Sequence, residues 1–292
     1  MSDIVVMTDT NSGMTREEGE KYGVAVLPMS FIINGKVYYE GIDISHEEFF
    51  QKLEQGAEVS TSQPAPGEVL DMWDSLLKKH DEIVYIPMSS SLSKSYETAV
   101  MLSRDYDGRV HVVDNRRVST PQKQTVMDAL ELAKQGKTGA QIKEILDADA
   151  LKSSTYIAVD TLKYLKKGGR ITGAAALLGT VLDMKPILVM HGGKLDAHGK
   201  IRGMKSARRA MIAAIRKEIE ENYQEDLAKG DIGLQMAYSS MNKETVADWE
   251  KQIREEFPEL SLHSDRLSLS LSCHIGPGGP GIAVGRIINK DW

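Results

Sequence analysis

The sequence predicts an α/β protein of two domains. Its 292 residues suit one large or two ordinary domains and allow a substantial hydrophobic core. Short apolar runs alternate with helical segments in the first half, and the second half mixes strands and helices less regularly. We therefore predict an N-terminal domain over residues 1–153, with a mostly parallel sheet covered by helices on both faces, and a mixed α/β domain over residues 154–292.

Each element of the first half has a local signal. Continuous apolar runs predict buried strands at residues 3–10, 24–35, 83–88 and 109–114. The pair Asn34-Gly35, followed by the run KVYYEG, predicts a hairpin. Helical periodicity marks residues 46–56, residues 66–80, a segment after Ser93 and a helix that ends near Lys134. Because buried strands alternate with helices, most neighbouring strands are expected to be parallel.

The second half carries weaker but recognisable signals. Strands are predicted at residues 155–160, at 281–288 and as a pair within 185–203 that is joined by a Gly-Gly turn. Helices are predicted at residues 161–169, 171–184 and 204–224 and around Trp249. The alternation of Leu and Ser in LSLHSDRLSLSLS, residues 260–272, predicts an extended segment that continues through Cys273 and His274.

Composition and charge exclude several classes. The formal charge of −6 gives no basis for nucleic acid as the main partner. The one cysteine, Cys273, excludes a disulfide framework and a cysteine-based zinc site, and indicates the reducing cytosol. The N-terminal run MSDIVVMTDT, interrupted by Asp3 and Asp9, is typical of a first strand rather than a signal peptide. No apolar run approaches the roughly 18 residues of a membrane span.

Three hydroxyl-rich segments follow predicted strands. They are DTNS at residues 9–12, VSTSQPAPG at 59–67 and SSSLSKS at 89–95. A single Ser or Thr before a helix usually caps the free amides of its first turn. Ligands of parallel α/β sheets bind outside the carboxyl ends of the strands, where helix amides and hydroxyls together favour anions. Three such loops on one edge therefore suggest a site for an oxyanion.

Several sharper motifs fail on their context. GPGGPG at residues 276–281 precedes a strand, whereas a dinucleotide-binding motif must open a helix, so it is read as a tight turn that brings backbone close to a ligand. The run GGKLDAHGK lacks the spacing of a phosphate loop, and no nucleophile elbow is present. The seven histidines show no metal-binding spacing, which leaves Asp9 and Asp114 as the possible ligands in principle.

The roles of two single residues, His274 and Arg202, are left open by the sequence. Cys273 and His274 point to opposite faces of a strand, so they are not expected to pair as nucleophile and base. His274 precedes the glycine-rich turn, and a site role and an ordinary solvated or core role are equally supported there. Arg202 stands in the short segment GKIRG, where it is either a surface arginine or an anion contact.

Eight segments in order resemble the DegV family of bacterial fatty-acid-binding proteins. They are DTNSG, STSQPAPGE, SSSLSKSYETA, VVDNRRVS, DTLKYLKKGGRI, KPIL, GKIRG and HIGPGGPG, and they extend along nearly the whole chain. Each segment alone is a weak signal, but the ordered set is specific. The resemblance implies two α/β domains with a ligand tunnel between them that holds one long-chain fatty acid.

The resemblance also implies roles for individual residues. The carboxylate of the fatty acid is expected on Thr61 of the T-S-Q-P motif, Ser93 of the S-S-x-L-S motif and His274 of the H-x-G-P-G motif. Arg202 corresponds to the arginine of the polar network at the mouth or of the kinase contact. Possible secondary contacts are their neighbours Ser62, Lys94, Ser95, Gly276 and Gly278. The segment 174–179, with Ile171 and Leu182, either lines the tunnel or packs as an ordinary helix.

The implied function is that of a carrier subunit of a fatty acid kinase. A partner subunit with ATP and magnesium would phosphorylate the bound carboxylate to an acyl phosphate. This chain is then expected to have no catalytic residue, no metal and no cofactor, to be cytoplasmic, and to touch membranes only transiently. The sequence departs from the family at Lys94, where glycine is usual, at Ser95, where threonine is usual, and after GPG in the last motif.

Two other classes of function stay open at this point. A stand-alone acyl hydrolase or acyltransferase would use Ser93 with His274, although no residue is identified that would orient the histidine. An enzyme for a phosphorylated ligand would use the hydroxyl loops, although no phosphate loop or metal motif is intact.

Overall fold

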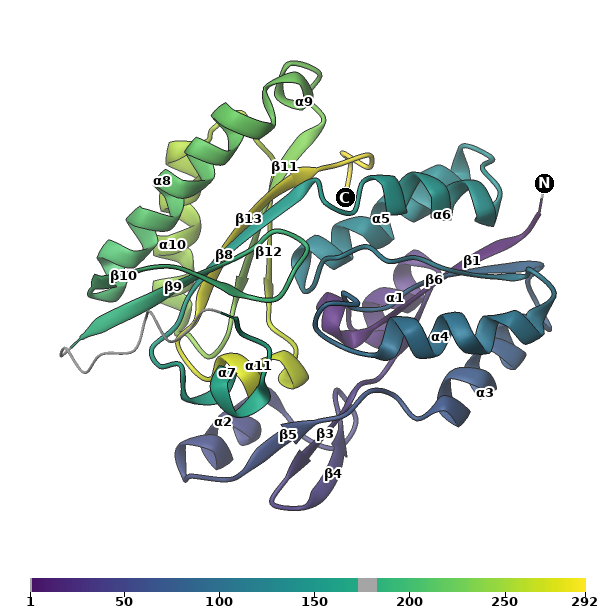
Figure 1. The fold of residues 1–292 in the computed structure, drawn as a ribbon, viewed down its shortest axis with the longest axis horizontal. Coiled ribbons are helices and arrows are strands. Elements are labelled where there is room, and N and C mark those ends of the chain that lie inside the picture. Colours follow the sequence, from purple (N-terminus) through teal and green to yellow (C-terminus); the bar gives the residue numbers. More distant parts are fainter. Residues whose placement is uncertain (1, 173–182) are drawn as a thin grey trace. The chain divides into compact units, whose positions relative to one another are not determined.

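The computed structural model describes residues 2–172 and 183–292 (Figure 1). The chain forms two compact units. Unit 1 comprises the residues up to Leu151 together with Ser268–Ser270 and Asp291–Trp292. Unit 2 comprises Lys152–Leu267 and Leu271–Lys290. Each unit has its own sheet and its own hydrophobic core.

A four-stranded parallel sheet forms the centre of unit 1. Its strands lie in the order β2-β1-β6-β7, and every neighbouring pair is parallel. Their bounds are β1 Ile4–Asp9, β2 Val24–Leu27, β6 Glu82–Ile86 and β7 Val110–Val112. This confirms the parallel sheet predicted from the continuous apolar runs.

Helices cover both faces of this sheet. Strand residues such as Met7 and Tyr85 pack on one face against Trp73 of α3 and Ala99 of α4. On the other face, the side chain of Gln122 of α5 donates a hydrogen bond to Thr8 at 3.2 Å. The helices of unit 1 are α1 Arg16–Tyr22, α2 His46–Glu54, α3 Pro66–Leu76, α4 Ser95–Ser103, α5 Thr120–Lys134 and α6 Gly139–Ala148, with short 3-10 turns at Thr10–Ser12 and Arg104–Tyr106.

A second, three-stranded antiparallel sheet corrects two predictions in unit 1. It has the order β4-β3-β5, with β3 Ser30–Ile33, β4 Lys36–Tyr39 and β5 Val59–Thr61. The predicted strand at residues 24–35 is therefore two strands in different sheets, because Pro28 between them lacks the amide needed to continue a ladder. The predicted loop at residues 59–67 begins as strand β5. The predicted hairpin turn is confirmed, with positive φ at Asn34 and Gly35.

A six-stranded mixed sheet forms unit 2, in the order β10-β9-β8-β13-β11-β12. Only β11 and β12 are parallel among these neighbours. The strands are β8 Ser153–Ala158, β9 Met184–Met190, β10 Asp196–Arg202, β11 Ile232–Tyr238, β12 Leu262–Arg266 and β13 Pro280–Arg286. The helices are α7 Lys163–Gly168, α8 Met204–Asn222, α9 Gln224–Ala228, α10 Lys243–Glu256 and α11 Leu269–Ile275. The mixed α/β architecture predicted for the second half is confirmed.

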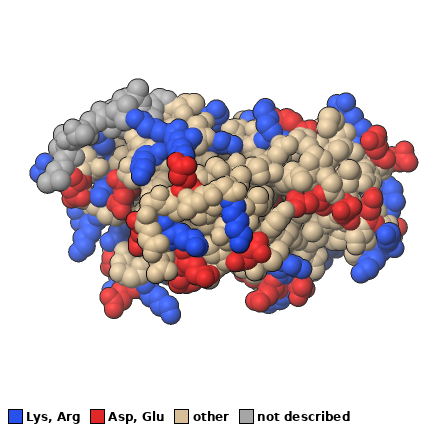
Figure 2. All heavy atoms as spheres, turned by 90° about the horizontal axis from the view of Figure 1, so that it is seen from below, with Lys and Arg blue, Asp and Glu red and all other residues tan. Residues whose placement is uncertain are grey.

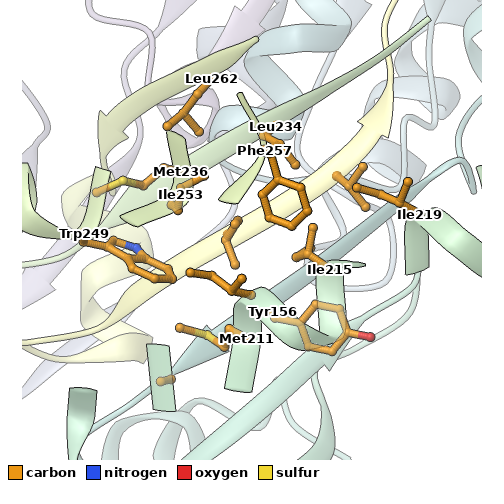
Figure 3. Packing of buried hydrophobic residues seen from close by; sticks show 14 of the residues in the cluster. Tyr156, Met211, Ile215, Ile219, Leu234, Met236, Trp249, Ile253, Phe257 and Leu262 are labelled. Atoms are coloured by element: carbon orange, nitrogen blue, oxygen red, sulfur yellow. The ribbon is translucent and has the colours of Figure 1, made fainter. Parts of the chain in front are cut away.

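The core of unit 2 lies between this sheet and helices α8 and α10 (Figure 3). Met211 and Ile215 of α8 and Trp249 and Ile253 of α10 are fully buried in it, and the strands contribute Leu234 among other residues. The apolar face predicted for residues 204–224 is the face that packs here. Burial of several large side chains, each contributing about 1.5–3 kcal/mol, stabilises the layer.

Helix α11 replaces part of a predicted strand. The extended segment predicted for residues 260–274 ends at Arg266, and Leu269–Ile275 is helical. Leu269, Ser272 and Cys273 are all buried. These positions are spaced by three and four residues, so they share one helix face, and this burial outweighs the period-two alternation of Leu and Ser.

The surface mixes both signs of charge. On the face shown in Figure 2, basic and acidic side chains are interspersed, which agrees with the modest formal charge of −6. Within residues 2–172 and 183–292, no helix is both long enough and apolar enough to cross a bilayer.

Candidate functional site

Ser93 lies in the loop between β6 and α4. Its hydroxyl oxygen accepts a hydrogen bond from the backbone amide of Ser95 at 3.2 Å and lies 2.7 Å from the hydroxyl oxygen of Ser95. Ser95 is buried and Ser93 is half-buried. If the Ser95 hydroxyl donates to Ser93, the Ser93 oxygen accepts twice and its own proton is available to an external acceptor. In that arrangement the loop presents a hydroxyl donor just before α4.

The other hydroxyls of this loop hold its backbone. The Ser89 and Ser91 hydroxyl oxygens are 2.7 Å apart, and the Ser90 hydroxyl donates to Asp114 at 2.8 Å. Asp114 also forms an ion pair with Arg116 at 2.8 Å. The clustering of serines is thus explained in part by local turns and capping, as expected for Ser in such positions.

Lys94 points away from this network. Its ammonium group pairs with Glu97 at 2.8 Å, and the two side chains are 78% and 45% exposed. An exposed pair at this spacing contributes little to stability. The lysine that stands in place of the usual glycine is therefore accommodated as a solvated side chain at the N-cap position before α4.

Thr61 is the last residue of strand β5. It is half-buried and pairs with Phe31, which is fully buried in the antiparallel sheet. Shortly after it, Gln63 accepts a hydrogen bond from Thr98 of α4 at 3.3 Å. This contact ties the T-S-Q-P segment to the helix that follows the serine loop. The hydroxyl oxygen of exposed Ser62 lies 3.3 Å from that of Ser30.

The DTNS segment is an internal support rather than an exposed loop. Asp9, Thr10, Asn11 and Ser12 are all buried. Asp9 accepts from the amides of Asn11 and Met88, each at 3.0 Å, and from the side chain of Gln122 at 3.3 Å. The hydroxyl of Ser12 donates to the carbonyl of Asp9 at 2.8 Å. The polar side chains of this segment are thus buried and hydrogen-bonded to other protein groups. This differs from the expectation that all three hydroxyl loops face an anion.

Two buried carboxyls of unit 1 have raised pKa values. Burial raises the pKa of Asp9 from 3.8 to about 6, against the lowering effect of its hydrogen bonds. Burial also raises the pKa of Glu40 from 4.5 to about 7, and the negative charge of Asp9 adds to this shift. The two groups form one polar cluster, in which Thr10 donates to Glu40 at 3.0 Å.

His274 lies in the last turn of α11 in unit 2. Burial of the imidazole, together with the positive charge of Arg170, lowers its pKa from 6.5 to about 4. The ring also packs on Gly168 so closely that a methyl group at position 168 would overlap it. At neutral pH His274 is therefore an uncharged ring held in one place, which acts as a hydrogen-bond donor or acceptor but not as a cation.

The glycine-rich turn after His274 is shaped by protein contacts. Gly276 and Gly278 have φ values of 76° and 75°, a region that favours glycine. A side chain at Gly276 would meet the ring of Tyr164, and one at Gly278 would meet the carboxylate of Asp160 at 2.7 Å. The turn thus brings its backbone close to α7 and to the end of β8, and glycine is required for this approach.

The predicted site residues divide between the two units. Thr61, Ser93 and their neighbours Ser62, Lys94 and Ser95 belong to unit 1. His274, Gly276, Gly278 and Arg202, which is exposed at the end of β10, belong to unit 2. Convergence of Thr61, Ser93 and His274 on one carboxylate stays a prediction. The proposed tunnel segment 174–179 and Leu182 lie outside the described residues.

The described residues include no group of three or more His, Cys, Asp or Glu side chains arranged to hold a metal ion. Asp9 accepts hydrogen bonds in the interior, and Asp114 is paired with Arg116. Both carboxylates that the sequence left as possible ligands thus have protein partners.

Three residues that act on His274 or on the start of α11 were not predicted. Gly168 and Arg170, which act on His274, lie in the KKGGR run, where a glycine pair after lysines indicates only a helix end. Glu40 has one weak signal, a carboxyl next to a predicted hairpin. Its partners are distant in sequence, so no local pattern identifies them.

Comparisons with known proteins agree along the whole chain. A family model described as an uncharacterised protein of the DegV family matches residues 3–286. A DegV domain-containing protein of Deinococcus radiodurans is 30% identical over 283 residues, which cover 96% of this chain and 98% of that protein. A DegV domain-containing protein of Staphylococcus aureus is 29% identical over 289 residues, covering 97% of this chain and 99% of the relative.

Solved structures of the same fold include proteins described by their ligand. A DegV family protein from Thermus thermophilus, described by its fatty acid binding, has a TM-score of 0.86 and 29% identity, covering 98% of this chain and all of that chain. A stearic-acid-binding protein from Eubacterium ventriosum has a TM-score of 0.84, covers 98% of both chains and, at 22% identity, supports the fold alone. On these matches, and on the two-unit architecture described above, the chain belongs to the DegV family.

Proposed function

We propose that this protein binds a long-chain fatty acid through its carboxylate and presents it to a kinase subunit. The observation that carries the binding proposal is the contact of the Ser93 oxygen with both the amide and the hydroxyl of Ser95. With the Ser95 hydroxyl as donor, the Ser93 proton can face a ligand. The similar Thermus thermophilus protein, described by its fatty acid binding, supports the same ligand class. Thr61 and His274 complete the proposed head-group site.

The proposed site recognises the carboxylate with neutral donors. Thr61 and Ser93 contribute hydroxyls, and His274 contributes an imidazole N–H because its pKa near 4 leaves it uncharged at neutral pH. Hydrogen bonds to a charged acceptor contribute about 1.5–3 kcal/mol each. A carboxylate that left water without such donors would be protonated or expelled. The head group therefore sets the orientation of the ligand.

The acyl tail supplies most of the affinity in this proposal. Burial of one methylene contributes about 0.8 kcal/mol, so a tail of about 16 methylenes offers at most about 13 kcal/mol before the cost of ordering it. Loss of one head-group contact should then weaken binding without abolishing it.

Lipid content tests the binding proposal. Native mass spectrometry of protein purified from a bacterial host should show a bound fatty acid. Ser93→Ala should weaken affinity for palmitate by about tenfold or more, whereas Ser90→Ala, which removes a hydroxyl of the same loop that bonds to Asp114, should keep it within about twofold. A folded wild-type protein that carries no fatty acid and binds none would overturn the proposal.

The kinase step is the second part of the proposal. The sequence contains no intact phosphate-loop or kinase motif. We therefore assign ATP and magnesium to a partner subunit that converts the bound carboxylate to an acyl phosphate. Arg202, exposed at the end of β10, is the candidate contact for that partner or for the developing phosphate, because a guanidinium binds oxyanions in a bidentate manner.

Reconstitution with ATP, free fatty acid and a cognate kinase subunit tests this step. Acyl phosphate should form only when both proteins are present, and Arg202→Ala should slow its formation. Arg254→Ala, which removes an arginine of α10 that pairs with Glu250, is the matched control and should leave the rate unchanged. Acyl phosphate made by this chain alone would refute the carrier role.

The alternative of a Ser93–His274 hydrolase is not favoured. A pKa near 4 makes His274 a weak general base at neutral pH. Labelling of Ser93 by a fluorophosphonate would be the result that favours it.

A further inference from the structure

The carboxylate of Glu40 is buried against the first residues of α11. One of its oxygens accepts a hydrogen bond from the backbone amide of Leu269 at 2.5 Å, and the other accepts from the Thr10 hydroxyl at 3.0 Å. The backbone amide of Ser270 also donates to it. Only 8% of Glu40 is exposed. A buried carboxylate is tolerated because it is hydrogen-bonded in this way.

These contacts give Glu40 the role of a helix cap. The first amides of a helix have no partner within the helix and must be satisfied from outside. Leu269 and Ser270 are the first two residues of α11, and Glu40 accepts from both. The cap comes from a residue 229 positions away in sequence, so it fixes where α11 begins as well as satisfying its backbone.

Asn11 holds the same segment from a second direction. Its side-chain oxygen accepts hydrogen bonds from the hydroxyls of Ser268, at 3.4 Å, and Ser270. Its backbone amide in turn donates to Asp9 at the end of β1. The start of α11 is therefore hydrogen-bonded to Asn11 and Glu40 of unit 1, the unit to which Ser268–Ser270 also belong.

We propose that Glu40 is a positioning residue for the fatty acid head-group site, acting through the helix on which His274 lies. The inference rests on the proposed function, because only that function assigns His274 to the carboxylate. Glu40 does not itself contact the ligand. It holds Leu269 and Ser270 and thereby sets the place of the imidazole at the other end of the same short helix.

The three hydrogen bonds to Glu40 favour a carboxylate over an amide, whereas burial opposes them and raises the pKa of Glu40 to about 7. Three donors point to it: two backbone amides and the hydroxyl of Thr10. Thr10 donates to the ionised Glu40 because a carboxylate can only accept, and the Thr10 oxygen in turn accepts from the amide of Met29 at 3.1 Å. A glutamine would direct its own NH2 group at one of these donors and lose at least one hydrogen bond. Glu40→Gln should therefore loosen the start of α11.

The experiment combines palmitate affinity with the pKa of His274. The pKa is measured by NMR on protein with labelled histidine and assigned with His274→Ala. In Glu40→Gln, affinity should fall by about tenfold, and the pKa of His274 should move from about 4 toward the ordinary value of 6.5 as the ring becomes less buried. A loss of stability alone would not move this pKa.

Glu82→Gln is the matched control. Glu82 also accepts a hydrogen bond from the first amide of a helix in unit 1, that of Gly139 in α6, at 3.1 Å. Its removal should lower stability while leaving the affinity and the pKa of His274 as in the wild type. Equal effects of Glu82→Gln and Glu40→Gln on the pKa of His274 would overturn the proposal.

The outcomes separate this inference from the proposed function. An unchanged pKa of His274 in folded Glu40→Gln protein would overturn the positioning role. If that variant fails to fold, Glu40→Asp, which keeps the charge on a shorter side chain, is measured in its place, with a smaller rise of the same pKa expected and no rise contradicting the proposal. Wild-type palmitate affinity in His274→Ala would instead refute the head-group assignment, and the pKa readout would still decide the role of Glu40.

Discussion

The imidazole of His274 lies directly against Gly168, with no room for a methyl group between them. Gly168 is the last residue of α7, so its conformation is helical and any residue could adopt it. Its requirement for glycine therefore comes from the contact with His274. The position of the ring is set by α7 as well as by its own helix, α11.

Gly168→Ala should displace His274 and weaken fatty acid binding. The overlap of the new methyl group with the ring must be relieved by a shift of the ring, and we expect a loss of affinity of about tenfold. Isothermal titration with palmitate measures the loss. Gly67→Ala in α3 is the control, because a side chain there meets nothing within 4 Å and alanine favours a helix by about 0.5–1 kcal/mol. Equal affinity of both variants would contradict the contact described here.

Ser95 should matter for binding through Ser93 rather than by touching the ligand. Ser95→Ala removes the hydroxyl that lies 2.7 Å from the Ser93 oxygen and that we propose as the donor to it. We expect affinity to fall by about tenfold, equivalent to about 1.4 kcal/mol. Ser95→Thr retains the hydroxyl and should bind nearly as the wild type. Competition with a fluorescent fatty acid distinguishes the two variants, and a wild-type result for Ser95→Ala would show that Ser93 needs no such support.

Fatty acid affinity should not fall between about pH 6 and about pH 8. The pKa of His274 is lowered to about 4, so over this range the ring stays neutral and the carboxylate stays ionised. A site that relied on an imidazolium would lose affinity steadily as the pH rose through the ordinary histidine pKa. Titrations at several pH values decide between the two, and a tenfold fall across this range would rule out the neutral donor.

Stability should respond to pH through Asp9 and Glu40. Their pKa values in the folded protein, about 6 and about 7, exceed the ordinary values of 3.8 and 4.5. At pH values between the ordinary and the raised pKa of each group, the folded state binds more protons than the unfolded chain. The contribution of the two carboxyls to stability is therefore greatest at low pH and is lost as the pH rises toward 7. The loss is of the order of 3 kcal/mol for each group at most.

Denaturant unfolding of the wild type and Glu40→Gln measures this contribution. The wild type should lose stability relative to the variant as the pH is raised from about 4.5 to about 7.5, because the variant lacks one of the titrating groups. The comparison cancels the groups that both proteins share. A stability difference that is constant over this range would show that Glu40 does not hold its proton in the folded state.

The parts of the fold with local signals were predicted from the sequence. The parallel strands of unit 1 are continuous apolar runs, and the Asn34-Gly35 turn has its own backbone preference. The errors occurred at a proline inside an apolar run and where tertiary contacts decide. Pro28 divides one apolar run between two sheets, and the Leu-Ser alternation before Cys273 becomes helix α11 because its buried face has helical spacing. A short segment of this kind fits both the two-residue period of a strand and the 3.6-residue period of a helix, and only the surface it packs against decides between them.

In the candidate site, too, residues with a local signal could be predicted and residues defined by distant contacts could not. The serine loop around Ser93 is predictable because a strand, a run of hydroxyls and a helix follow each other directly. The contact of Gly168 with His274 and that of Glu40 with Leu269 join residues far apart in the chain. Neither residue type is distinctive in its own segment, so only the folded chain identifies their roles.

A crystal structure of the palmitate complex tests the central claim most directly. We predict one carboxylate whose oxygens lie within hydrogen-bonding distance, about 2.6–3.2 Å, of the Thr61 and Ser93 hydroxyls and of a ring nitrogen of His274. A carboxylate bound elsewhere, or a head group that any of these three side chains cannot reach directly or through one water, would contradict it for that residue.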